Sequence, residues 1–281
     1  MLNLFKKLTY GVRIVLGKKQ QQEPIDVGGR STMMMHGGDE SATPFLYLHS
    51  TLGESFRWFP FHEALSKHFH VYAPMHPGFS KSEGFDQIDS IEDMAFHYIE
   101  MFDALRFQEP IIIGGVSLGG WIAAEIACRW PERIKKLWIA DAPGLWVEDV
   151  PLTDLFRHLP NPTKMREILF ADTNFWMARE IIKDRPSDEE IMVGYQNMTV
   201  LARVIWERPY NPKLADRLKR VECPTLLLWG EKDRLVPTAY GEAYRKCIKN
   251  SELKLIPDCG HLPMFEKELE FVSALVEFCQ K

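Results

Sequence analysis

The sequence has few of the features that mark metal, redox or disulfide-stabilised proteins. Its 281 residues include five cysteines, an odd number, at widely spaced positions and with no C-x-x-C pair among them. This spacing excludes the common cysteine-based zinc and redox motifs, and it favours reduced thiols in a cytoplasmic protein. We therefore predict that the protein uses no metal and no other cofactor.

Several other signals are missing as well. The formal net charge is -5, and no stripe of lysine and arginine interleaves with aromatic residues, which argues against nucleic acid as a partner. No apolar run reaches the length needed to cross a membrane. We do not expect a secretory signal, because the uncharged stretch 14–17 is too short for its apolar region and no small-residue cleavage site follows.

The N-terminal segment, residues 1–38, differs from the rest of the chain. Residues 1–19 contain several lysines and an arginine but no acidic residue, and the apolar residues between 2 and 16 recur at helical spacing. This predicts a basic amphipathic helix. We favour contact of this helix with the domain or with a second subunit in a homodimer, and the alternative is peripheral contact with an anionic membrane. Residues 18–38 fit either a linker or an early hairpin.

Short apolar runs alternate with amphipathic helical stretches through most of the chain. Strands are expected at 45–49, 69–73, 110–114, 136–141, 224–230 and 253–256, and helices at 56–68, 91–105, 118–130, 240–247 and from 266 onward. Such alternation predicts an α/β fold with a mostly parallel, doubly wound sheet. Between 146 and 214 only helical pieces are expected, at 172–183 and 188–206. We therefore predict a core formed by 39–145 and 215–281, with a helical lid at 146–214.

One motif carries the chemical argument. Gly115-Val116-Ser117-Leu118-Gly119 follows an expected strand and precedes an expected helix, the context of a nucleophile elbow. In such a turn the serine takes a strained backbone conformation, and the two glycines pass each other too closely for a Cβ atom. Ser117 is therefore the candidate nucleophile.

A serine nucleophile needs a base, and the base needs an acid that fixes its orientation. His261 is the candidate base because it lies on a short loop after the last expected strand. Asp233, just beyond the carboxyl end of the strand 224–230, is the preferred acid because it lies between the serine and the histidine in the chain. Asp141, at the end of the strand 136–141, is the alternative.

With these residues in place, the chain from about residue 40 to 281 resembles the serine-nucleophile branch of the α/β-hydrolase superfamily with a helical lid. The resemblance rests on the serine elbow, on the G-x-x-D-x-x-x-P segment that contains Asp233, and on the Gly-His pair that contains His261. It implies Ser117, Asp233 and His261 as the catalytic triad. It also implies an oxyanion hole formed by the backbone N–H groups of Leu118 and Thr51.

The chain departs from the family pattern at two loops. The family's His-Gly pair after the third strand is His49-Ser50 here, and its D-x-P-G-x-G-x-S turn is replaced by 76–82, which begins with His76. By resemblance, His49 braces the oxyanion loop without titrating in catalysis. We interpret the turn at 76–82 as structural.

The expected lid is rich in large apolar side chains, which favours an apolar acyl or aryl substrate. Our candidate pocket residues are Trp146, Trp176, Met177 and Leu262. The lid also offers cations for a substrate carboxylate, namely Arg157, Arg179 and Arg203.

These observations predict a serine hydrolase that cleaves the carboxylic ester of an apolar or aryl small molecule through an acyl-enzyme. Two alternatives share the same residues. One resembles the carbon-carbon bond hydrolases of aromatic ring-cleavage products, although those enzymes usually have an aromatic residue where this chain has Leu262. The other is a ligand-binding receptor of the same fold.

Overall fold

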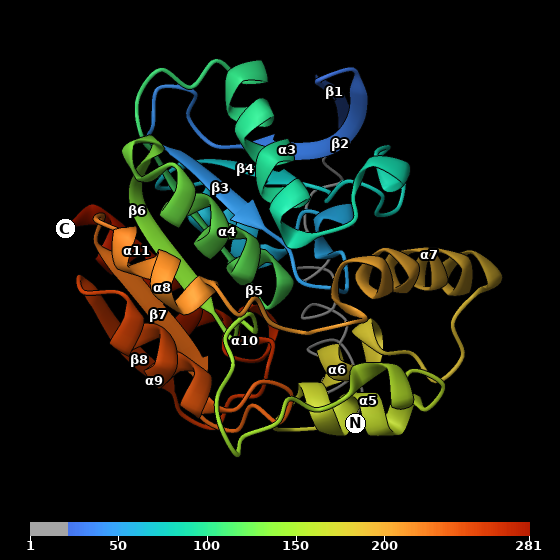
Figure 1. The fold of residues 1–281 in the computed structure, drawn as a ribbon. Coiled ribbons are helices and arrows are strands. Elements are labelled where there is room, and N and C mark those ends of the chain that lie inside the picture. The colour runs from blue at the N-terminus through green and yellow to red at the C-terminus, as the bar shows by residue number, and fades with distance from the viewer. Residues whose placement is uncertain (1–21) are drawn as a thin grey trace, which may run out of the picture.

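The computed structural model describes residues 22–281, so the amphipathic helix predicted for residues 2–16 lies outside the described residues. An eight-stranded sheet in the order β1-β2-β4-β3-β5-β6-β7-β8 forms the centre of the described part (Figure 1). Its strands are β1 (Glu23–Val27), β2 (Arg30–Gly37), β3 (Pro44–Leu48), β4 (His70–Pro74), β5 (Ile111–Val116), β6 (Ile134–Ala140), β7 (Thr225–Gly230) and β8 (Ser251–Ile256). Strands β3 to β8 are parallel, whereas β2 pairs antiparallel with both β1 and β4. The predicted mostly parallel sheet is confirmed.

The first two strands form the hairpin that was one of two expectations for residues 18–38. Its turn is made by Gly28 and Gly29, whose φ angles of 58° and 81° lie in the left-handed region that glycine adopts without strain. Val27 at the end of β1 is fully buried. The sheet thus begins at Glu23, and the expected core boundary at residue 39 falls after two of its strands.

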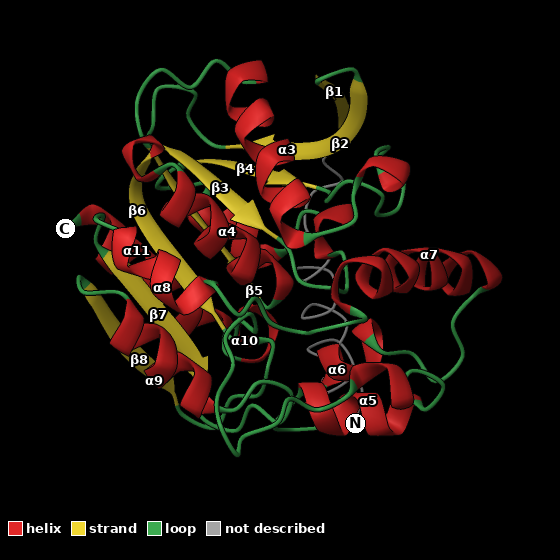
Figure 2. Ribbon diagram, in the orientation of Figure 1, coloured by secondary structure: helices red, strands yellow, loops and turns green. Residues whose placement is uncertain are grey.

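Helices cover both faces of the sheet (Figure 2). One face carries four helices, α3 (Ile91–Ala104), α4 (Leu118–Arg129), α8 (Leu214–Arg217) and α9 (Thr238–Cys247). Each of these helices contacts the next one in this order. The other carries α2 (Pro60–Leu65) and α11 (Glu268–Gln280), which pack together, and α10 (Pro263–Glu266) adjoins α11. With helices on both faces, the inner strands are buried on both sides, and every residue of β5 and β7 is buried.

Two expected helices are shorter than predicted and one helix was not predicted; the helix expected at 172–183 is only α6 (Trp176–Ile181). The helix expected at 56–68 is only α2, because Pro60 begins it and holds the preceding Phe59 in an extended conformation. The helix α5 (Pro162–Leu169) was not predicted from the sequence. Its signal was present, since the Asn161 side chain accepts a hydrogen bond from the Lys164 N–H at 3.0 Å and Pro162 occupies the first helical position.

The segment between β6 and β7 contains the remaining helices, and we call its residues 146–214 the insertion. It includes α5, α6 (Trp176–Ile181) and α7 (Asp188–Ile205), which lie together beyond one end of the sheet (Figure 1). A bridge between Gly144, just before the insertion, and Tyr210, near its end, holds the two connections to the core together. Among residues 22–281, no helix is long and apolar enough to cross a bilayer.

Candidate active site

Ser117 occupies the turn between β5 and α4 and has the strained backbone that the motif predicts. Its φ is 55° and its ψ is -118°, values that a non-glycine residue rarely adopts. A Cβ atom on Gly115 would lie 2.4 Å from the carbonyl carbon of Gly119, and one on Gly119 would lie 2.1 Å from the Leu48 carbonyl oxygen. The two glycines are therefore needed for the chain to make this turn.

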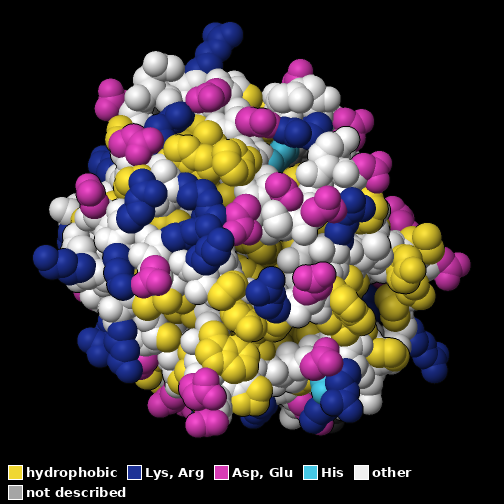
Figure 3. Space-filling model, in the orientation of Figure 1, with side chains coloured by type: hydrophobic (Ala, Val, Ile, Leu, Met, Phe, Trp, Pro, Cys, Tyr) yellow, Lys and Arg dark blue, Asp and Glu magenta, His cyan; other side chains and the backbone are white. Residues whose placement is uncertain are grey.

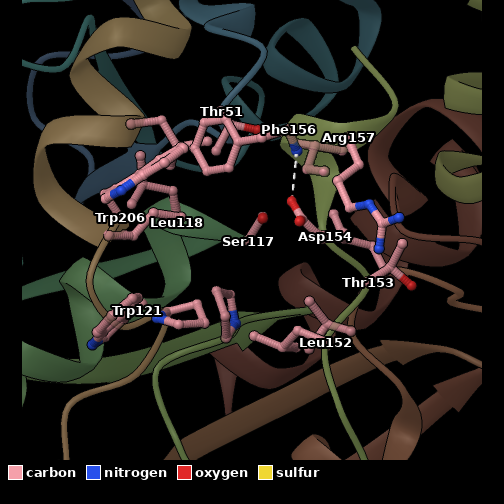
Figure 4. Close-up of a pocket in the computed structure, with 17 residues that line it drawn as sticks. Thr51, Ser117, Leu118, Trp121, Leu152, Thr153, Asp154, Phe156, Arg157 and Trp206 are labelled. Atoms are coloured by element: carbon pink, nitrogen blue, oxygen red, sulfur yellow. Dashed lines mark hydrogen bonds between the residues drawn. The ribbon is translucent and has the colours of Figure 1, made fainter. Parts of the chain in front are cut away.

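Ser117 opens onto a cavity of about 600 Å³ at the end of the sheet. Figure 4 shows its hydroxyl between Trp206 and Phe156 on one side and Trp121 and Leu152 on the other. The wall combines residues of the core with residues of the insertion: Thr51, Ser117, Leu118, Trp121, Pro143, Leu152, Thr153, Asp154, Leu155, Phe156, Arg157, Leu201, Ile205, Trp206, Pro209, Leu235 and Val236. Most of this surface is apolar, which suits an apolar ligand.

His261 and Asp233 form a buried pair on the loops after β8 and β7. His261 Nδ1 lies 2.8 Å from Asp233 Oδ2, so the ring donates its Nδ1 proton to the carboxylate. Asp233 Oδ1 accepts hydrogen bonds from the N–H groups of Leu235 and Val236 at 2.8 and 3.0 Å. The pair leaves His261 Nε2 buried and without a partner among the described residues. A nitrogen in this state is equipped to take a proton from a hydroxyl, and such contacts often close only when substrate binds.

Asp141, the alternative acid, lies near this pair and makes a different contact. Its Oδ1 accepts a hydrogen bond from the Gly230 N–H at 2.8 Å, across the ends of β6 and β7. One ligand atom from each of Asp141, Asp233 and His261 lies within 4.8 Å of the other two. The structure thus brings all three predicted groups together, with Asp233 in contact with the histidine.

The two N–H groups predicted for the oxyanion hole belong to residues on the same cavity wall as Ser117. Leu118 begins α4, where backbone N–H groups have no partner within the helix. The Thr51 loop is held by the buried Glu54, whose carboxylate accepts hydrogen bonds from the Ser50 N–H and hydroxyl, each at 2.7 Å. Ser50, which stands where the family pattern has a glycine, therefore helps to hold this loop through its two hydrogen bonds to Glu54.

His49 and His76 reinforce this loop from behind. His49 Nδ1 donates to the Ser50 carbonyl at 2.6 Å, and its Nε2 accepts the His76 backbone N–H at 2.8 Å. His76 Nε2 donates to the His49 carbonyl at 2.8 Å, while its Nδ1 accepts the Tyr98 hydroxyl. Burial lowers the pKa of His49 to about 3 and that of His76 well below its usual value. Both rings are therefore neutral braces, as expected for His49 and for the turn at 76–82.

The four predicted pocket residues do not lie on the wall of the cavity. Trp146 and Trp176 are exposed, at 58% and 46%, while Met177 and Leu262 are buried in apolar packing. The wall is formed instead by the stretch 152–157 and by the end of α7 with the residues after it. The periodicity of a helix shows which residues share a face, but not which face meets the cavity. No sequence signal marked Leu152 or Leu201 as wall residues.

The three candidate arginines are in different surroundings. Arg157 is exposed and lies on the cavity wall. Arg203 pairs instead with Asp89 at 2.6 Å, and Arg179 is not part of the wall. Only Arg157 of the three is placed to meet an anionic substrate group in the cavity.

Comparison with known proteins places this chain among the alpha/beta hydrolases. The model of the alpha/beta hydrolase family matches residues 34–275. Lipase 1 of Psychrobacter immobilis is 24% identical over 85% of this chain and 77% of its own length. The 2-hydroxy-6-oxo-2,4-heptadienoate hydrolase of Pseudomonas putida is 25% identical over 95% of both chains. Among solved structures, a bacterial membrane phospholipase A superposes with a TM-score of 0.80 at 23% identity, covering 99% of this chain and 91% of that one.

Proposed function

The chain belongs to the alpha/beta hydrolase family, and on that premise we propose that it is a serine hydrolase acting on the carboxylic ester of an apolar or aryl small molecule. The observation that carries the proposal is that Ser117, Leu118 and Thr51 lie together on the wall of one largely apolar cavity. An ester bound there has its carbonyl beside a nucleophile and two N–H donors. Its hydrocarbon part fills the space beneath the insertion, which acts as the lid.

The reaction follows from the contacts of each group. Ser117 Oγ attacks the ester carbonyl carbon while His261 Nε2 takes the hydroxyl proton, and the Leu118 and Thr51 N–H groups bind the oxyanion. When the tetrahedral intermediate collapses, the ester C–O bond breaks and His261 returns the proton to the leaving alcohol. Water then attacks the acyl-enzyme with the same base, which releases the carboxylic acid and restores Ser117. Asp233 holds the His261 tautomer throughout, through the contact at 2.8 Å.

Labelling with a fluorophosphonate probe, followed by a panel of aryl esters of graded acyl length, tests this proposal. We expect the probe to react at Ser117 and the Ser117→Ala variant to lose about 10⁴- to 10⁶-fold in kcat. Ser80→Ala is a matched control, because Ser80 also has a positive φ, 50° against 55° for Ser117, but is not on the cavity wall. Full activity in Ser117→Ala contradicts the proposal. A ligand-induced rise in Tm without turnover by the unmodified protein favours a receptor instead.

One observation supports a second candidate, hydrolysis of a carbon-carbon bond in an aromatic ring-cleavage product. Arg157 is on the cavity wall, and among residues 22–281 no acidic side chain forms an ion pair with it. Substrates of the dienoate type named for several relatives carry a carboxylate that such a cation can bind.

Turnover of 2-hydroxy-6-oxo-6-phenylhexa-2,4-dienoate, compared with that of neutral aryl esters, separates the two candidates. Ester hydrolysis as the main activity predicts higher kcat/KM for the neutral esters and little effect of Arg157→Gln on them. A higher kcat/KM for the dienoate, lost in Arg157→Gln, favours the carbon-carbon hydrolase.

A further inference from the structure

Asp141 is a fully buried carboxyl group that the proposed reaction does not use. It follows β6 directly, with a φ of 50°, and its backbone N–H donates to the Leu228 carbonyl at 3.1 Å. Its Oδ1 accepts the Gly230 N–H at 2.8 Å, but its Oδ2 is buried and has no partner among the described residues. Burying a polar atom without a hydrogen-bond partner destabilises the folded state, so the position of this oxygen needs a structural explanation.

The surroundings of Asp141 contain negative and neutral groups. Asp233 follows β7, and His261 and the buried Cys259 thiol lie on the loop after β8. Within residues 22–281, the ion pairs include none between a lysine or arginine and either aspartate, and Asp233 pairs only with His261. Two carboxylates this close and this deeply buried cannot both be ionised without a cation.

Hydrogen bonding decides which carboxyl keeps its proton. Asp233 receives the Leu235 and Val236 N–H groups and the His261 Nδ1 proton, an arrangement that suits a carboxylate. Asp141 receives a single donor, from Gly230. Burial, followed by the negative charge of Asp233, raises the pKa of Asp141 well above its usual value.

We propose that Asp141 is a neutral carboxylic acid whose Oδ2–H donates to the Asp233 carboxylate and so positions the acid that orients His261. This role rests on the proposed function, because it acts through the triad. Asp141 is then a positioning residue that touches no substrate. By sharing the negative charge of Asp233, this hydrogen bond weakens the attraction between that carboxylate and the imidazolium that forms when His261 takes the Ser117 proton.

Two substitutions distinguish this role from that of an ionised second acid. In Asp141→Asn the amide oxygen can accept the Gly230 N–H and the amide NH₂ can donate to Asp233, so the variant mimics a protonated acid. We expect its kcat/KM for an aryl ester, and the acid limb of its pH profile, to match those of the unmodified protein. Asp141→Leu removes the donor. Its kcat/KM should fall about tenfold, and its acid limb should move to higher pH by on the order of half a unit to one unit.

The opposite shift overturns the proposal. If Asp141 is ionised, Asp141→Asn removes a negative charge near His261 and moves the acid limb to lower pH. Asp149→Asn and Asp149→Leu are matched controls, because Asp149 also has a positive φ, 60°, but is exposed and lies off the cavity wall. The Tm of each variant is measured alongside, so that a loss of folding is recognised.

Infrared difference spectra test the protonation state without reference to activity. At neutral pH, the C=O stretching band of a protonated carboxyl should be present in the unmodified protein and missing from Asp141→Asn. It should remain in Asp149→Asn. Burial also raises the pKa of Glu54, but any band from Glu54 is common to all these spectra and cancels. A protein without this difference band lacks a neutral Asp141. Failure of probe labelling or ester turnover contradicts the proposed function and leaves the infrared result intact.

Discussion

The carboxyl edge of the sheet and the insertion meet at the same cavity but are built in different ways. At the sheet edge, Ser117, Asp233 and His261 are at most 7% exposed, and backbone groups fix their positions. In the insertion several large apolar side chains are exposed, among them Tyr195 and Trp206, each 72% exposed. Figure 3 shows apolar side chains gathered on the surface over α7, at the right of the view. Backbone hydrogen bonds hold the polar groups at the sheet edge, whereas the insertion contributes mostly apolar side chains to the cavity wall.

The largest expected effect is at the sheet edge, where substitution of Asp233 should lower kcat far more than substitution of Asp141. Asp233→Asn replaces the carboxylate that accepts the His261 Nδ1 proton, so the ring can adopt the wrong tautomer. We expect kcat to fall about 10⁴-fold. Steady-state kinetics with an aryl ester measures this loss, with Asp141→Asn as the isosteric comparison. A small effect in Asp233→Asn together with a large one in Asp141→Asn reverses the assignment of the acid.

A smaller effect concerns the pH dependence of stability, which arises in the core. Burial lowers the pKa of His62 from 6.5 to about 3, so between these values the unfolded chain binds a proton that the folded protein does not. Stability therefore falls as the pH falls below about 6.5. At about pH 5 this residue alone should cost about 2 kcal/mol of unfolding free energy.

His62→Gln tests the origin of this loss. A glutamine at this position can still accept the Phe59 N–H that His62 Nδ1 accepts at 3.1 Å, but it does not titrate. Urea unfolding at neutral pH and at about pH 5 should show a pH-dependent loss smaller by about 2 kcal/mol in the variant. The exposed His68, replaced in the same way, is the control. An unchanged pH dependence in His62→Gln means that His62 is already protonated in the folded protein at about pH 5, which contradicts the lowered pKa.

The insertion should show its effect in substrate binding. Trp206 lies on the cavity wall and contacts Phe156, with ring centroids 5.5 Å apart, whereas Trp176 is not on the wall. We expect Trp206→Ala to raise KM for long-chain or aryl esters about tenfold, as apolar contact area is lost, with a smaller change in kcat. Trp176→Ala should leave both unchanged. An equal effect of the two substitutions contradicts the assignment of the wall.

The same contrast explains how much could be predicted from the sequence. The elbow was predictable because Gly115 and Gly119 meet a local steric requirement, and strands β3 to β8 were predictable along the chain from alternating apolar runs. His261 and Asp233 were identified by their positions after strands. Their mutual contact, and the contact between Asp141 and Gly230, depend on how the ends of three strands come together. The pocket wall was not predictable, because Met177 and Leu201 have similar sequence surroundings but only Leu201 faces the cavity.

The smallest expected effect comes from comparing a glycine-to-alanine substitution in each of the two regions. A Cβ on Gly119 meets backbone, whereas a Cβ on Gly194, in the middle of α7, has no heavy atom within 4 Å. Alanine favours a helix interior over glycine, so Gly194→Ala should stabilise α7 by about 0.5–1 kcal/mol without changing kcat/KM. Urea unfolding measures this gain, and Gly119→Ala should instead destabilise the protein and abolish activity. If α7 unfolds independently of the core, the gain appears in amide exchange of α7 and not in global unfolding. A loss of stability in Gly194→Ala contradicts the position of this glycine in an unobstructed helix.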